Sequence, residues 1–289
     1  MISKLEFREG QLRFPRNLSN RKGVIMYNVK KIDKECIKKM RDSYYKNVTA
    51  PMDDMWELGI IGKGDFYTIE KEAVLGYFVV DADNNLLQFF LKEEYEKCAL
   101  NIFEFIKKKK EINQAFVSTY EPRYLSLCLD KNDGVEINSM LYTQMKTIEF
   151  KNPLKGISSE LAKKENLDEI LVYHREKVDI EGDWLIEYCK TLIAYNGLIL
   201  FKIGNKIIGT GEMRPSYSSK SYANIGMTVS KNYRKQSIGT YILTQMRILA
   251  NKKGLKAICS TSKENIASQR TIEKSGFYPY HRVLTVKLR

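Results

Sequence analysis

The sequence is poor in the residues that cross-link a fold or bind metal. Only five of its 289 residues are cysteines, and only His174 and His281 are histidines. An odd number of scattered cysteines favours reduced thiols over a disulfide framework, which indicates a cytoplasmic protein. Two distant histidines argue strongly against a histidine-rich metal site, so no metal is expected.

Long hydrophobic runs are also missing. No apolar segment approaches the roughly 18–20 residues of a membrane-spanning helix, so no membrane partner is expected. The first residues, MISKLEFREGQLRF, contain no apolar secretory segment. Hydrophobic residues still make up 43% of the chain, enough for the core of one large domain or of two ordinary ones.

Negative charge is scarce in the last quarter of the chain. Residues 1–150 contain 24 basic and 23 acidic residues, whereas residues 151–289 contain 24 and 12. From Met213 onward there are 15 basic residues and only two acidic ones, Glu264 and Glu273. This excess indicates either a solvated basic surface or an anionic ligand or partner.

Hydrophobic periodicity predicts the elements of the second half. The pattern indicates helix over 160–190, a hairpin over 197–213 around Gly204-Asn205, and a strand at Tyr222–Val229. A helix ending near Lys253, a strand at 255–260, a short helix capped by Asn265 and a strand at 281–288 follow.

The first half shows a similar order. Strands are expected at 66–72, 74–81, 86–91 and 115–119, with a helix over 93–110 before the last of them. The order β-β-β-α-β therefore occurs twice, although the residue identities do not match. We predict two units in tandem, 1–150 and 151–289, divided near the segment 151-KNPLKG-156.

The segment 232-NYRKQSIGTYILTQM-246 joins a predicted strand to a predicted helix. Free N–H groups at a helix N-terminus favour an anion, and Gly239 permits close approach of the backbone. Arg234 and Lys235 add positive charge. The P-loop motif GxxxxGK[ST] and the Rossmann motif GxGxxG are both absent, so a pyrophosphate site of another kind is expected.

At these residues the sequence resembles the GNAT superfamily of N-acetyltransferases. The segment 234-RKQSIGT-240 is similar to its signature R-x-x-G-x-G/A, and 265-NIASQRTIEKSGF-277 is similar to its next motif. The resemblance covers about 150–289. It implies an α+β fold whose central sheet is mixed but mostly antiparallel and flanked by helices. The first half then resembles a second, degenerate unit of this kind.

The resemblance implies that acetyl-CoA is the acyl donor. In the family the strand before the loop is splayed from its neighbour and pairs with the pantetheine arm. Carried over, the strand contacts fall on Met227, Thr228 and Val229. The pyrophosphate contacts fall on Arg234, Lys235, Gln236, Ser237, Ile238, Gly239 and Thr240, and further contacts fall on Asn265 and Ser268.

Two positions depart from the family pattern. Ser237 stands where the signature has its first glycine, and Ile272 stands where many members have a tyrosine that protonates the leaving thiolate. Attack by an amine on a thioester still benefits from a base near the amine and an acid near the sulfur.

Three residues are candidates for the proton transfers. Glu212 is an isolated carboxylate in a region almost free of acids, so it is either the base or the partner of a nearby cation. Asn224 could hold a water for proton relay. Tyr280 could replace the missing acid, or it could serve a structural role.

The first half lacks a phosphate loop. The segment 91-LKEEYEK-97 occupies the corresponding place, has no glycine, and its glutamates would repel phosphate. This unit is expected to have lost CoA binding and either to shape the acceptor pocket or to pack against the second unit as a fixed pseudo-dimer.

The sequence therefore predicts acetyl transfer to a primary amine of a small molecule or peptide. The alternatives are a non-catalytic CoA-binding module, a basic nucleic-acid-binding module, and a tRNA-dependent aminoacyltransferase with tandem units. Aromatic residues do not interleave with the basic ones, which weighs against sequence-specific RNA contact.

Overall fold

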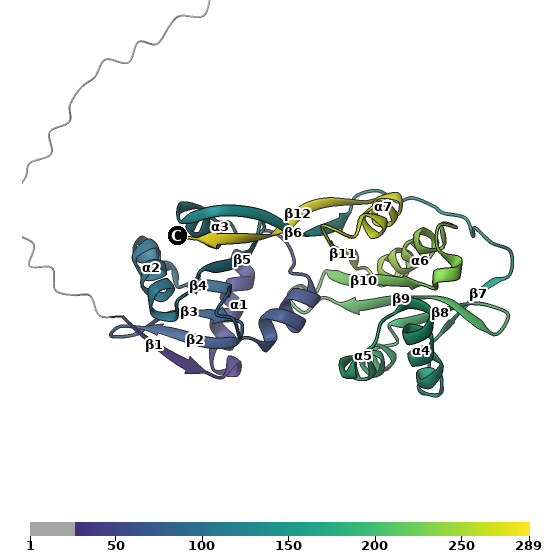
Figure 1. The fold of residues 1–289 in the computed structure, drawn as a ribbon, viewed down its shortest axis with the longest axis horizontal. Helices are drawn as coiled ribbons and strands as arrows, with labels where there is room; N and C mark the ends of the chain where they lie inside the picture. The colour runs from purple at the N-terminus through teal and green to yellow at the C-terminus, as the bar shows by residue number, and fades with distance from the viewer. Residues whose placement is uncertain (1–26) are drawn as a thin grey trace, which may run out of the picture.

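Twelve strands form one mixed sheet in the computed structural model, which describes residues 27–289 (Figure 1). The strand order is β1-β2-β3-β4-β5-β12-β6-β11-β10-β9-β8-β7. All neighbours pair antiparallel except β4 with β5 and β10 with β11. The bounds are β1 Asn28–Ile32, β2 Asp65–Glu70, β3 Val74–Val80, β4 Leu86–Leu91, β5 Gln114–Ser118, β6 Asn132–Gln144, β7 Ile157–Leu161, β8 Leu198–Ile203, β9 Lys206–Pro215, β10 Tyr222–Val229, β11 Lys256–Ser262 and β12 Phe277–Leu288.

Helices cover both faces of this sheet, which confirms the predicted fold class (Figure 1). The α-helices are α1 Lys38–Asn47, α2 Ala99–Lys110, α3 Pro122–Asp130, α4 Leu167–Tyr173, α5 Asp183–Ala194, α6 Ile238–Lys252 and α7 Ile266–Lys274. Shorter helical turns are η1 Lys34–Ile37, η2 Met55–Ile60, η3 Ile61–Lys63, η4 Glu93–Cys98, η5 Lys164–Asn166, η6 His174–Val178 and η7 Lys231–Tyr233.

The side chains of β8 point alternately to the two faces of the sheet, and each face packs against different helices. Leu198 and Leu200 pack with α4 and α5, whereas Phe201 packs on the opposite face with α6. In the first half, α2 and α3 cover one face and α1 covers the other. Each half of the sheet thus has helices on both of its faces, and the two halves meet edge to edge within the one sheet.

The two halves are joined by their last strands, β6 and β12, which lie side by side at the centre of Figure 1. Residues Ser139–Thr143 of β6 pair with β11, so β6 extends the sheet of the second half. Residues Val283–Lys287 of β12 pair with β5, so the end of the chain extends the sheet of the first half. The predicted division near residue 150 falls between β6 and β7 and stays a prediction.

Most elements that the sequence pattern predicts for the second half are present in the structure. Gly204 has a positive φ of 56° in the hairpin turn, as the Gly-Asn pair predicts. Asn265 caps α7, where its side chain accepts a hydrogen bond from the Ser268 N–H at 3.0 Å. The helix expected over 160–190 was wrong in part. Its first residues form β7, and a turn with positive φ at Asp179 and Gly182 separates α4 from α5.

Within residues 27–289, no helix combines the length and apolar character that crossing a membrane requires.

Candidate active site

The strands β10 and β11 diverge after a short parallel pairing. Only Tyr222–Asn224 pair with Lys256–Ile258. Beyond this point β10 stays paired with β9 as far as Val229, while β11 continues along β6. The backbone of residues 225–229 therefore has a free edge toward the opening, which confirms the splay that the resemblance implies.

A cavity of about 250 Å³ occupies this opening. Ile225, Gly226, Met227 and Thr228 form one wall, and Cys259 and Ser260 of β11 lie opposite. Ser268 and Ile272 of α7 and Tyr188 of α5 also line it. Of the expected ligand residues, Met227, Thr228 and Ser268 thus face one cavity.

The loop at the outer end of β10 presents unused backbone amides. Among the described residues, the hydrogen bonds outside regular elements use no N–H group of residues 235–240. Ile238, Gly239 and Thr240 form the first turn of α6, where the N–H groups lack helical partners. Arg234 and Lys235 are exposed beside them. Free amides, a helix dipole and two cations together favour a bound anion at this loop, which we call the cradle.

Gly239 lies tightly between neighbouring side chains. A Cβ atom there would lie 3.1 Å from the Thr271 methyl and 3.4 Å from the sulfur of Met227. The glycine therefore lets the start of α6 pack close to β10 and α7, two elements that also line the cavity.

The serine that departs from the signature adopts a conformation that suits glycine. Ser237 has a φ of 60°, and Lys235 has a φ of 61°. The left-handed region costs a residue with a Cβ atom about 1–2 kcal/mol. The loop thus keeps the glycine conformation without the glycine.

Ser237→Gly is therefore expected to stabilise the protein. Relief of strain exceeds the extra backbone entropy of glycine, which leaves a gain of about 0.5–1 kcal/mol in the free energy of unfolding. Urea denaturation measures it. Gln236→Gly is the matched control, because Gln236 has no positive φ and should show no gain. If the two variants were equally stable, the backbone of Ser237 would not be strained.

Glu212 faces the inner end of the cavity. It pairs with Gly226 across the sheet, and its carboxylate lies over that glycine, where a Cβ atom would come within 2.6 Å of Oε1. The Tyr188 hydroxyl lies 2.8 Å from both carboxylate oxygens, and the Arg214 guanidinium lies 3.8 Å away. Glu212 therefore lines the cavity and also has the cationic neighbour considered above. Burial and the Glu212 charge raise the pKa of Tyr188.

Asn224 and Tyr280 lie apart from this cavity. Asn224 is buried, and its side-chain oxygen accepts a hydrogen bond from the Asp54 N–H at 3.3 Å. Tyr280 is 63% exposed and packs edge-on against Tyr278 and His281. Ile272, in contrast, lines the cavity and brings no proton donor to it.

The first half has a corresponding opening that its own side chains fill. The strands β4 and β5 pair only at Leu86 and Ala115. The space beside β4 is about 30 Å³ and is lined by residues that include Phe89, Phe90 and Tyr124. The Tyr124 hydroxyl donates to the backbone oxygen of Leu86 at 3.0 Å. This space is large enough for a water molecule but too small for a pantetheine chain.

A titration of CoA is accordingly expected to give one site per chain. The first unit also carries Glu93, Glu94 and Glu96 in η4, where the second unit has its cradle. These charges repel phosphate, and the opening behind them is filled. Isothermal titration calorimetry gives the stoichiometry. A value near two would show that the first unit binds CoA.

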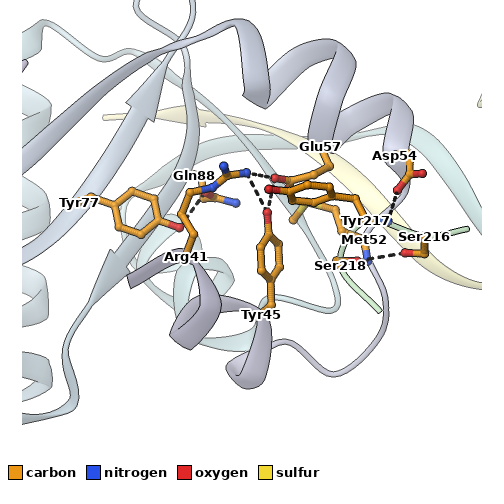
Figure 2. A network of polar contacts seen from close by, with 10 residues as sticks. All are labelled: Arg41, Tyr45, Met52, Asp54, Glu57, Tyr77, Gln88, Ser216, Tyr217 and Ser218. Atoms are coloured by element: carbon orange, nitrogen blue, oxygen red, sulfur yellow. Dashed lines mark hydrogen bonds and ion pairs between the residues drawn. The ribbon is translucent and has the colours of Figure 1, made fainter. Parts of the chain in front are cut away.

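The first half instead contributes a segment to the second half's site. Asp54, just before η2, is 4% exposed, and its Oδ1 accepts a hydrogen bond from the Tyr217 N–H at 3.1 Å. Met52 donates its N–H to the Ser218 hydroxyl at 3.0 Å. Figure 2 shows Asp54 and Met52 directed at the loop 216–218.

A buried charge cluster holds this segment in place. Glu57 of η2 is fully buried and accepts hydrogen bonds from the Arg41 guanidinium and the Tyr45 hydroxyl (Figure 2). The Tyr217 ring lies 5.8 Å from the Arg41 guanidinium and packs edge-on against Tyr45. Sequence patterns gave no sign of this segment, because its contacts reach across more than 160 residues.

Comparison with known protein families agrees with the fold described above. A model described as an acetyltransferase (GNAT) domain matches residues 33–145, and one described as the acetyltransferase (GNAT) family matches residues 161–277. The chain therefore belongs to the GNAT acetyltransferases and carries two such domains in tandem. It is an enzyme of the GNAT N-acetyltransferase type. No curated protein matches the sequence.

Solved structures agree with the tandem architecture. A GNAT-family acetyltransferase from Colwellia psychrerythraea is 27% identical with a TM-score of 0.84, and the match covers 91% of this chain and all of that one. A GCN5-related N-acetyltransferase from Sphaerobacter thermophilus is 11% identical with a TM-score of 0.60, covering 91% and 95% of the two chains. A tandem GNAT protein from the clavulanic acid biosynthesis pathway is 10% identical with a TM-score of 0.55, covering 90% and 98%. The last two show the fold alone.

Proposed function

We propose that the second unit transfers the acetyl group of acetyl-CoA to the primary amine of a small molecule or peptide. One observation carries the proposal: the free edge of β10 connects the unused amides of residues 235–240 to a cavity that Glu212 lines. The amides hold the pyrophosphate, and the backbone at Met227 and Val229 pairs with the pantetheine arm.

The reaction is a direct attack in a ternary complex. Glu212 takes a proton from the acceptor ammonium, directly or through a water. The free amine attacks the thioester carbonyl, the carbon–sulfur bond breaks, and the acetyl group remains on nitrogen. Because Ile272 supplies no acid, the thiolate takes its proton from water. The five cysteines are all free, so a cytoplasmic location is part of this proposal.

Release of free CoA thiol tests the proposal. With acetyl-CoA and a panel of amines, we expect thiol release that depends on the amine, and initial-rate plots that intersect, as a ternary complex requires. Thiol release at a rate that does not depend on the amine would contradict the proposed function. So would parallel initial-rate plots, which indicate an acetyl-enzyme intermediate.

A further inference from the structure

A groove of about 720 Å³ lies where η2 of the first half meets α5 and the end of β9. Its lining includes Met55, Trp184 and Tyr188, which also line the cavity beside β10. The groove therefore continues the acetyl-CoA cleft on the side away from the pyrophosphate cradle. An acceptor that reaches the thioester can occupy it.

The walls of this groove are apolar and open to solvent. Met55, Leu58 and Ile60 project from η2, and Trp184, Tyr195 and Tyr217 lie on the side of the second half. Each of these six side chains is more than a third exposed. Large apolar residues that gather in this way around a hollow mark a binding surface for an apolar group.

The floor of the groove carries a carboxylate, Asp54, that has an oxygen free to accept a further hydrogen bond. Among the described residues, Asp54 accepts a hydrogen bond only at Oδ1, from the Tyr217 N–H. Arg214, the nearest cation on the floor, already binds the Tyr188 hydroxyl at 2.8 Å and neighbours Glu212. Burial raises the pKa of Asp54 to about 6, so the group is charged at neutral pH.

We propose that this groove binds the acceptor and selects a monoamine on an apolar body, such as an alkylamine or arylalkylamine, whose ammonium is attracted by Asp54 and delivered to Glu212. The two carboxylates both lie near Arg214, so one ammonium passes from the first to the second. This proposal rests on the proposed function and adds the acceptor class to it. A polar amine such as glucosamine would leave its hydroxyls facing apolar walls. A polyamine would bring a second cation near Lys63, which lines the same groove.

A series of amines of increasing chain length tests whether the apolar walls bind the acceptor. In a series from ethylamine to octylamine, kcat/KM should rise about fourfold for each methylene that the groove buries. Leu58→Ser should flatten this rise, with the largest loss for octylamine. The substitution lies at a side chain that is 49% exposed, so the fold should tolerate it. A flat series in the wild type, or a preference for glucosamine or spermidine, would overturn the inference while acetyl transfer to amines stands.

The carboxylate is tested by Asp54→Asn, which keeps the acceptor for the Tyr217 N–H and removes the charge. The KM for octylamine should rise about 10-fold to 100-fold, and the KM for acetyl-CoA should not change. Asp65→Asn is the matched control, because Asp65 pairs with Lys31 on the surface. An unchanged amine KM in Asp54→Asn would remove this carboxylate from the proposal.

A binding readout separates this inference from the proposed function. Trp184 lines the groove, whereas the other tryptophan, Trp56, packs against Phe116. Octylamine should change the tryptophan fluorescence of the wild type but not of Trp184→Phe. If no amine is acetylated, a saturable change that strengthens with chain length supports the groove even though the proposed function fails. No change with octylamine overturns the groove.

Discussion

Gly239→Asp is expected to fold and to lose CoA binding. Within residues 27–289, the amides of the first turn of α6 have no partner outside the helix. A Cβ atom at Gly239 would lie 3.1 Å from the Thr271 methyl and 3.4 Å from the Met227 sulfur. An aspartate adds a side chain at this close contact and a negative charge beside the bound pyrophosphate. We expect CoA affinity to fall at least about 100-fold, since two or more charge-assisted hydrogen bonds are lost.

Calorimetry of CoA binding measures this loss, and circular dichroism confirms that the variant folds. Asn251→Asp is the matched control, because it adds the same charge at the exposed C-terminal end of α6. CoA affinity should survive there. Unchanged affinity in a folded Gly239→Asp protein would show that the pyrophosphate binds elsewhere.

Glu212→Gln is expected to lower kcat about 10²-fold to 10⁴-fold if this carboxylate is the base. Glutamine keeps the hydrogen bond with Tyr188 but cannot take a proton. CoA affinity should be unchanged. The loss should shrink as pH rises, because the acceptor amine then arrives already deprotonated.

The pH profile of this variant distinguishes the two roles of Glu212. A carboxylate that only neutralises Arg214 would give a loss that is the same at every pH. Glu187→Gln on α5 is the control, since Glu187 pairs with Lys190 on the surface and should show no effect. A kcat for Glu212→Gln within twofold of the wild type would exclude Glu212 as the base.

Local chemistry explains which parts of the site the sequence could predict. The strand β10, the cradle and the cap at Asn265 each depend on residues within a few positions of one another, so periodicity and motif spacing reveal them. Tyr280 shows the limit of such reasoning. Its place at the start of a predicted strand suggested a residue near the site, yet the structure leaves it on the surface.

Long-range pairing explains what the sequence could not predict. The exchange of β6 and β12 depends on partners such as Ile137 and Leu284, which are distant in the chain and carry no local mark of pairing. The groove depends on a segment of the first half whose Met52 and Asp54 form hydrogen bonds with Ser218, Tyr217 and Asn224 of the second half. Charge repulsion at η4 was visible in the sequence, but the filling of the first opening by Tyr124 was not.

A structure of the protein with bound CoA and octylamine tests the account most directly. We predict one CoA per chain, with its pyrophosphate on the amides of residues 235–240, its pantetheine arm along residues 227–229, and its thiol near Glu212 and Ile272. The amine should lie with its alkyl chain in the groove and its nitrogen between Asp54 and Glu212. CoA between β4 and β5, or a pyrophosphate away from the start of α6, would contradict the assignment of the active site to the second unit.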